Sequence, residues 1–241
     1  MRLTRALDIV ASLSVIVASA VVVWAQAGKG LPRASSSSGT DISNKQVELV
    51  VPAADKAYVA GQTVIVEFAD FQCPYSGRYA REIFGDVKKV LVDSGKVRYA
   101  VMDFPLEGLH PAAFGASEAA RCADASHRFW DMREELFKHQ EDLSTEALGR
   151  YAEAIGLDRK GFQSCMQDPS TARSVRNEMD QGRRAGITAT PSFIIGRVER
   201  DGNVRGLRMV AGAVPYTTIR AAVESITSFK APFERFLSLV L

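Results

Sequence analysis

Hydrophobic positions along the chain form short runs with β-type composition and longer runs with helical spacing. Two runs rich in β-branched and aromatic residues predict strands at Thr63–Phe68 and Val97–Phe104, and a weaker run predicts a strand at Val47–Val51. Between the two stronger runs, apolar residues recur at helical spacing from Pro74 to Ser94-Gly95. Pro74 suits the first turn of that helix, because the N–H that proline lacks would have no partner there.

From Pro111 to about Ala185 the pattern is helical throughout, with short breaks such as Gly156 and Asp168-Pro169. The expected helices are Ala112–Trp130, Met132–His139, Thr145–Ile155, Arg159–Gln167 and Ser170–Ala185.

After this helical block the pattern returns to strands. We expect strands at Ser192–Ile195 and Leu207–Ala211, a hairpin turn at Asp201-Gly202-Asn203, and a closing helix Val214–Phe229 with Pro215 in its first turn. Strands that alternate with helices imply a sheet with parallel strands. The predicted fold class is therefore α/β, with an all-helical subdomain inserted at about 110–185.

The first 27 residues have the pattern of an export signal. Arg2 and Arg5 precede the apolar run Ile9–Trp24, and Ala25-Gln26-Ala27 follows as a small-x-small cleavage signature. The run is marginally long enough to span a bilayer, so residues 1–27 are expected to be either a cleaved signal peptide or an N-terminal membrane anchor. Both alternatives place the rest of the chain on the periplasmic or extracellular side.

Composition separates the folded part from its flanks. Residues 28–45 are rich in Gly, Ser, Asn and Lys and predict a flexible linker. The folded domain is expected over residues 46–229, with a C-terminal tail at 230–241. Lys and Arg number 30 against 28 Asp and Glu, and no basic block occurs, so no nucleic-acid partner is expected.

Cys73 is the candidate reactive group. It lies between a strand and the start of a helix, where unpaired backbone N–H groups and the helix dipole favour the thiolate, the nucleophile of disulfide exchange. Tyr75 would shield one side of the sulfur. The alternative is a buried structural cysteine, because free thiols are among the most buried side chains.

The residues around Cys73 resemble the active-site segment of DsbA-like thiol–disulfide oxidoreductases. The resemblance begins with Phe68-Ala69-Asp70-Phe71-Gln72-Cys73-Pro74-Tyr75-Ser76 and extends over roughly Val47 to Phe229. The other matching segments, in order, are Asp103-Phe104-Pro105-Leu106, His110-Pro111, Arg121-Cys122, Phe129-Trp130, Gly156-Leu157-Asp158 and Gly186-Ile187-Thr188-Ala189-Thr190-Pro191-Ser192-Phe193. This family has a thioredoxin fold interrupted by a helical domain.

The resemblance implies roles for further residues. Thr190-Pro191 would be a cis peptide that lies against the cysteine and binds substrate together with Pro74 and Tyr75. Glu67 would be a buried acid that helps move protons, unless it is an exposed glutamate on an edge strand. Cys122 and Cys165 would form a structural disulfide, as in some family members; the alternative is that one of them resolves Cys73.

Ser76 departs from the family motif, which has a second cysteine at this position. A hydroxyl cannot store a disulfide or release a trapped substrate. It can donate a hydrogen bond toward the Cys73 sulfur, and this bond would favour the thiolate. A monothiol route remains, in which an outside thiol or the substrate's own thiol resolves the mixed disulfide.

The expected partners are protein thiols and disulfides, with glutathione or a membrane redox partner as candidates. No cofactor or metal site is expected, because the cysteine and histidine spacing does not fit zinc, and His110, His127 and His139 are expected to be solvated or capping residues. Two alternatives compete with a catalyst: a thioredoxin-fold module that binds client proteins, and a glutathione-using transferase. The export signal and the presence of Cys73 argue against the transferase.

Overall fold

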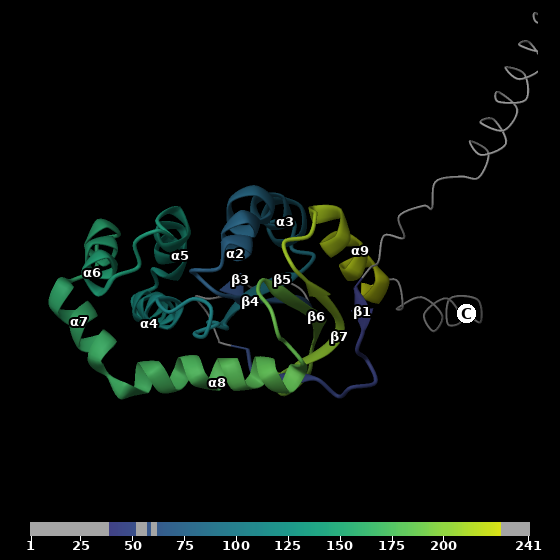
Figure 1. Ribbon diagram of the computed structural model, residues 1–241. Helices are drawn as coiled ribbons and strands as arrows, with labels where there is room; N and C mark the ends of the chain where they lie inside the picture. Colours follow the sequence, from purple (N-terminus) through teal and green to yellow (C-terminus); the bar gives the residue numbers. More distant parts are fainter. Residues whose placement is uncertain (1–38, 52–56, 59–61, 228–241) are drawn as a thin grey trace, which may run out of the picture. The chain divides into compact units, whose positions relative to one another are not determined.

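The computed structural model describes residues 39–51, 57–58 and 62–227 (Figure 1). The predicted signal or anchor at 1–27, the predicted tail at 230–241 and most of the linker lie outside these residues. Within the described part of the chain, no helix is both long enough and apolar enough to cross a membrane.

A mixed sheet forms the centre of the fold. Its strands lie in the order β1-β7-β6-β4-β5-β3, and β2 also pairs with β7. Only β4 and β5 run parallel to each other; the other pairs among the described strands are antiparallel. The strands are β1 (Thr40–Asp41), β2 (Glu48–Leu49), β3 (Ala57–Tyr58), β4 (Thr63–Ala69), β5 (Arg98–Asp103), β6 (Ser192–Val198) and β7 (Val204–Ala211).

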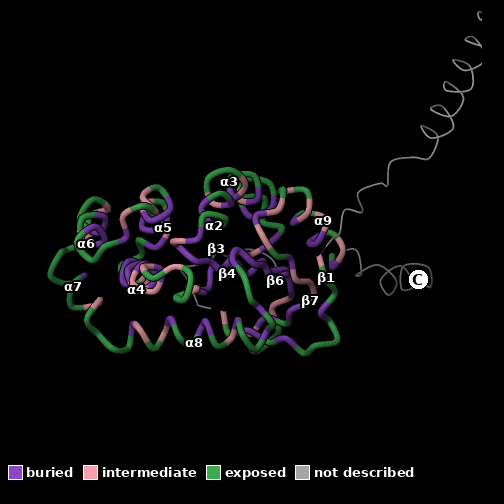
Figure 2. Tube along the Cα trace, viewed as in Figure 1, coloured by how far each residue is buried: buried purple, intermediate pink, exposed green. Residues whose placement is uncertain are grey.

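The central strand β4 is buried along its whole length, and its alternating residues serve two cores (Figure 2). Val64, Val66 and Phe68 pack on the side that α8 (Pro169–Ala185) covers. Ile65 faces the opposite side, which is covered by the helices that follow Cys73 and by α9 (Tyr216–Thr227). A strand buried on both faces reads as a continuous apolar run, which is why the sequence indicates it clearly.

The predicted helix after Cys73 is one helical run that contains two π-helical turns. It comprises α2 (Pro74–Arg78), η1 (Tyr79–Ile83), α3 (Phe84–Val87) and η2 (Lys88–Val92). Pro74 occupies the start of α2, as expected.

The predicted inserted helical subdomain is present and contains α4 to α8. Beside α8 these are α4 (Ala113–Asp124), α5 (Phe129–Lys138), α6 (Thr145–Ala154) and α7 (Arg159–Gln167). Side chains cap three of the helices: Ser144 accepts from Ala147 N, and Asp158 and Asp168 likewise cap α7 and α8. Gly186, with φ of 88°, ends α8 in the left-handed conformation.

Several predicted boundaries were wrong. The helix predicted at Ala112–Trp130 is broken after Asp124, where the chain turns through His127 with φ of 58°. The linker was expected to reach residue 45, yet Thr40–Asp41 pair with β7 and Ile42 is 1% exposed. The closing helix begins at Tyr216, so Pro215 precedes its first turn.

Candidate active site

Cys73 is the N-cap residue of α2 and is the free cysteine of the described chain. Its side chain is buried, and its Sγ–H donates to the backbone oxygen of Thr190 over 3.3 Å. The peptide bond between Thr190 and Pro191 is cis. The cysteine sulfur therefore lies where the loop between β4 and α2 contacts the segment that leads into β6.

Ser76 is fully buried one turn after Cys73. Its Oγ accepts a long hydrogen bond of 3.5 Å from the backbone N–H of Asp70. No hydrogen bond joins Ser76 to the Cys73 sulfur among the residues described, so the predicted contact between the two side chains is absent. The Ser76 hydroxyl thus faces the backbone of Asp70, with one weak hydrogen bond.

Tyr75 lies between Cys73 and Ser76 in sequence and is 59% exposed. The Arg78 guanidinium carbon lies 5.8 Å from the centroid of its ring. Arg78 also donates to the backbone oxygen of Ala213 over 3.0 Å. The active-site helix therefore presents an exposed aromatic ring beside a fixed cation.

Asp70 is a site residue that the sequence analysis did not single out. It is fully buried, and its Oδ1 accepts from the backbone N–H groups of Gln72 and Cys73 at 2.8 and 2.9 Å. Its Oδ2 accepts from Leu106 N at 2.8 Å and lies 2.8 Å from His110 Nδ1. His110, expected to be solvated or capping, is instead paired with this buried carboxylate.

Gln140, which follows α5 in the helical insertion, was also missed. Its Nε2 donates to the backbone oxygens of Phe71 and Cys73 over 2.8 and 3.0 Å. Its Oε1 accepts from Arg81 Nη1 over 3.0 Å. The insertion also donates Ala112 N–H to Gln72 Oε1 over 2.8 Å. The inserted helices therefore hold the loop that carries the cysteine.

The signals for these residues are weak in the sequence. An aspartate three residues before a helical position matches a local turn or cap motif, and this pattern could have drawn attention to Asp70. Nothing local marks Gln140, because its partners lie 67 and 69 positions away.

Glu67 is fully buried on β4 and is not the exposed edge residue of the alternative prediction. Its Oε2 accepts from Tyr99 Oη over 2.8 Å and from Arg133 Nη2 over 3.1 Å. The hydroxyl oxygens of Tyr79 and Tyr99 are 3.0 Å apart, which extends the network. Among the described residues, no hydrogen bond links Glu67 directly to Cys73.

Arg133 comes from α5 of the insertion and lies among aromatic rings. Its guanidinium carbon is 4.5 Å from the ring centroid of Phe84 and 5.0 Å from that of Phe137. Burial is the largest single influence and opposes its charge, but Glu67, Tyr99 and Tyr79 together outweigh it and raise the pKa of Arg133. Burial, together with the charge of Glu67, raises the pKa of both Tyr79 and Tyr99. The network therefore contains one ion pair and two neutral phenols.

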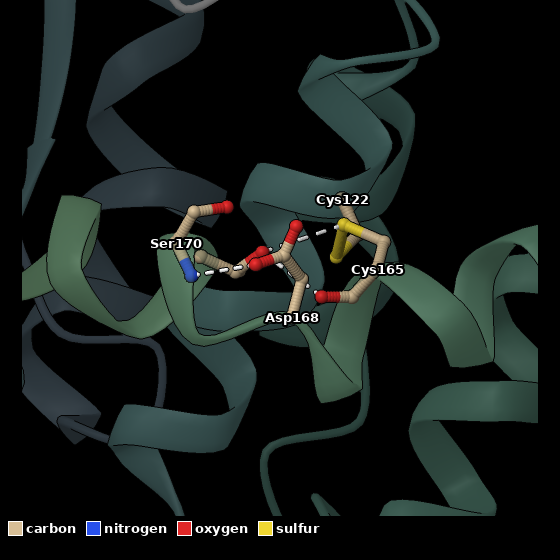
Figure 3. The surroundings of a disulfide bond; sticks show 5 residues. Cys122, Cys165, Asp168 and Ser170 are labelled. Carbon is tan, nitrogen blue, oxygen red and sulfur yellow. Dashed lines mark hydrogen bonds between the residues drawn. A yellow bond between two sulfur atoms is a disulfide. The ribbon is translucent and has the colours of Figure 1, made fainter.

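Cys122 of α4 and Cys165 of α7 form a disulfide within the insertion (Figure 3). Thr171 Oγ1 donates to the backbone oxygen of Cys165 over 2.9 Å, and Asp168 caps the next helix by accepting from Ser170 N. Both sulfurs are thus engaged, and neither is a free thiol that could resolve Cys73. Among the described residues, no group of three or more His, Cys, Asp or Glu side chains could hold a metal ion.

Comparison with known proteins identifies the fold. A sequence model of the family described as thioredoxin matches residues 59–210. The crystal structure of Wolbachia pipientis alpha-DsbA1 aligns with a TM-score of 0.62 and 19% identity, covering 75% of this chain and 94% of that one. Pseudomonas aeruginosa DsbA2 aligns with a TM-score of 0.60 and 21% identity, covering 76% of this chain and all of that one. At these identities the likeness is one of fold.

Curated sequence relatives carry a different name. The Na(+)/H(+) antiporter NhaA 3 of Salinispora tropica is 34% identical over 154 residues, which cover 62% of this chain and 23% of that protein. NhaA 1 of Salinispora arenicola is 31% identical over 159 residues, 64% of this chain and 24% of that protein. The chain thus spans about a quarter of the length of the curated relatives that it matches.

Proposed function

Because this chain belongs to the thioredoxin family and has the DsbA-like fold, we propose that it is an extracytoplasmic thiol–disulfide exchange protein acting as a monothiol through Cys73. One observation carries the proposal. The free thiol of Cys73 begins α2 and faces the backbone of the cis Thr190-Pro191 peptide, while the buried hydroxyl of Ser76 occupies the position of a second thiol.

The exchange step balances without an added oxidant. The Cys73 sulfur, as thiolate, attacks one sulfur of a substrate disulfide. A disulfide forms between Cys73 and that sulfur, the original S–S bond breaks, and the departing sulfur leaves as a thiolate that takes up a proton. A second thiol, from glutathione or from the substrate itself, then attacks the mixed disulfide and returns Cys73 to its starting state.

The proposed substrates are protein or low-molecular-weight disulfides, with glutathione or a membrane redox partner as the resolving agent. The exposed ring of Tyr75 and the backbone of Thr190-Pro191 would contact the substrate beside the sulfur. The signal-like pattern of residues 1–27 supports a location outside the cytoplasm. Sodium–proton exchange is not proposed for this chain, since the match covers 23% of the Salinispora tropica antiporter.

In this proposal Glu67 has a structural role and not the proton-transfer role expected from the sequence. Its carboxylate is engaged by Arg133 and Tyr99, so we assign it to holding α5 on the sheet and derive no proton transfer to Cys73 from it.

The test is trapping of the mixed disulfide. Wild-type protein incubated with a peptide disulfide should gain the mass of one half of that peptide on Cys73, and added glutathione should release it. Cys73→Ser should gain nothing, while Ser94→Ala, which alters an exposed serine far along the helical run, should behave as wild type. A wild-type protein that gains no mass would contradict the exchange proposal.

The alternative function is a non-catalytic thioredoxin-fold module that binds client proteins. The observation that favours it is the burial of Cys73, which is 3% exposed, while the side chains of Tyr75 and Leu109 are 59% and 74% exposed. This alternative predicts that Cys73→Ser retains the ability to suppress aggregation of an unfolded client, whereas Tyr75→Ser loses it.

A further inference from the structure

Within the active-site loop, Asp70 is the side chain with the most hydrogen-bond partners. A carboxylate taken fully out of water is destabilising unless hydrogen bonds replace its hydration. Here both oxygens are satisfied: Oδ1 accepts from two backbone N–H groups, and Oδ2 accepts from Leu106 N and lies 2.8 Å from His110 Nδ1. In the His110 tautomer that carries its hydrogen on Nδ1, the ring donates to this oxygen.

The two oxygens hold two different segments. Oδ1 holds the turn into α2, including the backbone N–H of Cys73 itself at 2.9 Å. Oδ2 holds the 106–110 segment that leads from β5 toward the helical insertion. The carboxylate therefore fixes the cysteine relative to a segment about 36 to 40 positions further along the chain.

This arrangement also affects how well a thiolate is stabilised at the cysteine. The positive end of a helix favours a thiolate through its free N–H groups. Asp70 accepts from the N–H groups of Gln72 and Cys73, which directly precede α2, and so places a carboxylate beside that helix end. A hydrogen-bond donor on Oδ2 shifts the negative charge of the carboxylate toward that oxygen and away from the cysteine. His110 is the side chain that supplies this donor. The imidazole remains 19% exposed, so the pair lies at the edge of the site.

We propose that Asp70 and His110 are positioning residues for Cys73. Asp70 fixes the main chain of the cysteine, and His110 holds the second oxygen of Asp70 so that the loop keeps the geometry in which Sγ faces Thr190. This inference rests on the proposed exchange function and names two residues that control its rate.

The test compares variants that differ in the hydrogen bond to Asp70. His110→Leu removes the donor, whereas His110→Asn keeps a side-chain N–H at the position of Nδ1, the atom that contacts Asp70. The rate of mixed-disulfide formation with a peptide disulfide should fall about tenfold in His110→Leu and by less than about threefold in His110→Asn, as expected for loss of a hydrogen bond to a charged group. His139→Leu is the matched control, because it breaks a histidine–carboxylate contact with Glu135 in the insertion, and it should react at the wild-type rate.

Asp70→Asn probes the same pair from the other side. An asparagine can keep one oxygen for Gln72 and Cys73 but places an amide N–H₂ against the donors of Leu106 and His110. It should therefore be as slow as His110→Leu. The proposal is overturned if His110→Leu reacts at the wild-type rate, or if His110→Asn is as slow as His110→Leu.

A second measurement separates this inference from the proposed function. Alkylation of Cys73 by iodoacetamide reports the exposure and reactivity of the thiol and needs no disulfide exchange. If wild type exchanges no disulfide, the exchange function fails. The positioning inference still stands if the rate of alkylation changes at least about threefold in His110→Leu and is restored in His110→Asn. Unchanged alkylation in both variants, with exchange intact and unaffected, overturns the positioning inference alone.

Discussion

Ser76 is the residue at which this chain differs chemically from a dithiol catalyst. It is buried, one helical turn from Cys73, and the only hydrogen bond of its hydroxyl among the described residues is the 3.5 Å contact from Asp70 N. A contact of that length is weak, so little stability depends on the hydroxyl. Sulfur in place of this oxygen changes one atom and keeps the side-chain geometry.

We therefore expect Ser76→Cys to form a disulfide between Cys73 and the introduced thiol. The variant should oxidise a reduced, unfolded substrate over several turnovers when an oxidant is supplied, whereas wild type should give only a mixed disulfide. Quantification of free thiols and the yield of refolded substrate measure the two effects.

Ser117→Cys is the matched control for that substitution. Ser117 is also fully buried, but it lies on α4 of the insertion. It should confer no oxidase activity. If Ser76→Cys forms its disulfide and still oxidises nothing, the surface that binds substrate has diverged, and the binding-module function becomes the better account.

At the scale of elements, the contact between α2 and the end of α5 depends on Gly77. A Cβ placed on Gly77 would overlap Gln140 Oε1, and it would lie 2.8 Å from Arg81 Nη1. Gly77→Ala must therefore displace the carboxamide that binds the oxygens of Phe71 and Cys73. We expect Gly77→Ala to lower the free energy of unfolding by about 1–3 kcal/mol, the cost of leaving buried polar groups unpaired.

A double-mutant cycle checks the cause. Gln140→Ala removes the side chain that the new methyl group would displace, so Gly77→Ala should cost much less in that background than in wild type. Urea unfolding of the four proteins gives the coupling energy. Additive effects would show that Gly77 is required for another reason.

The ion pair between β4 and α5 is the second link between elements. Arg133→Met would remove the cation and leave the Glu67 carboxylate buried among aromatic rings, which typically destabilises a protein by about 3–5 kcal/mol. The double variant Glu67→Gln/Arg133→Met removes both charges and should recover most of that loss. Denaturant unfolding measures both, and equal losses in the single and double variants would contradict a dominant role for the charge.

The outcome for individual elements shows what a local pattern can predict. β4 and the start of α2 were predictable, because a strand rich in β-branched residues and a proline after the cysteine are local signals. β1 was not, because Thr40 and Asp41 are polar and exposed and form a strand only through pairing with β7. The break at His127 was missed since an alanine-rich segment with helical spacing does not reveal a left-handed turn residue.

The candidate site likewise has residues that a local pattern predicts and residues that it does not. Cys73, Ser76 and Thr190-Pro191 lie in a recognisable motif, and the structure brings them to one junction. The partners of the Cys73 loop come from Leu106, His110, Ala112 and Gln140, between 36 and 69 positions away from the residues that they contact. Such contacts arise from the packing of the insertion on the sheet, which no local pattern encodes.

For the whole molecule, the insertion and the sheet are joined by buried charge as well as by apolar packing. Arg121 of α4 pairs with Glu178 of α8 and lies 3.3 Å from Asp103 Oδ2 at the end of β5. Burial opposes the charge of the guanidinium, but the two carboxylates outweigh it and raise the pKa of Arg121. Together with Glu67–Arg133 and the Gln140 contacts, this cluster gives reason to expect one cooperative unit rather than two independent domains.

The last prediction tests that cooperativity through one probe in the insertion and one at the cysteine. Trp130 lies in the insertion and Cys73 on the sheet side, and Trp24→Phe would remove the other tryptophan of the chain. In urea, the fluorescence of Trp130 and the alkylation of buried Cys73 should change with the same midpoint, as two-state unfolding requires. Replacing both Cys122 and Cys165 by alanine opens a loop of sequence separation 43, which should cost about 4 kcal/mol in the chain-entropy model and shift both midpoints together to lower urea. If only the Trp130 midpoint shifted, the insertion would unfold on its own, and the contacts of Gln140 and His110 would not couple it to the cysteine.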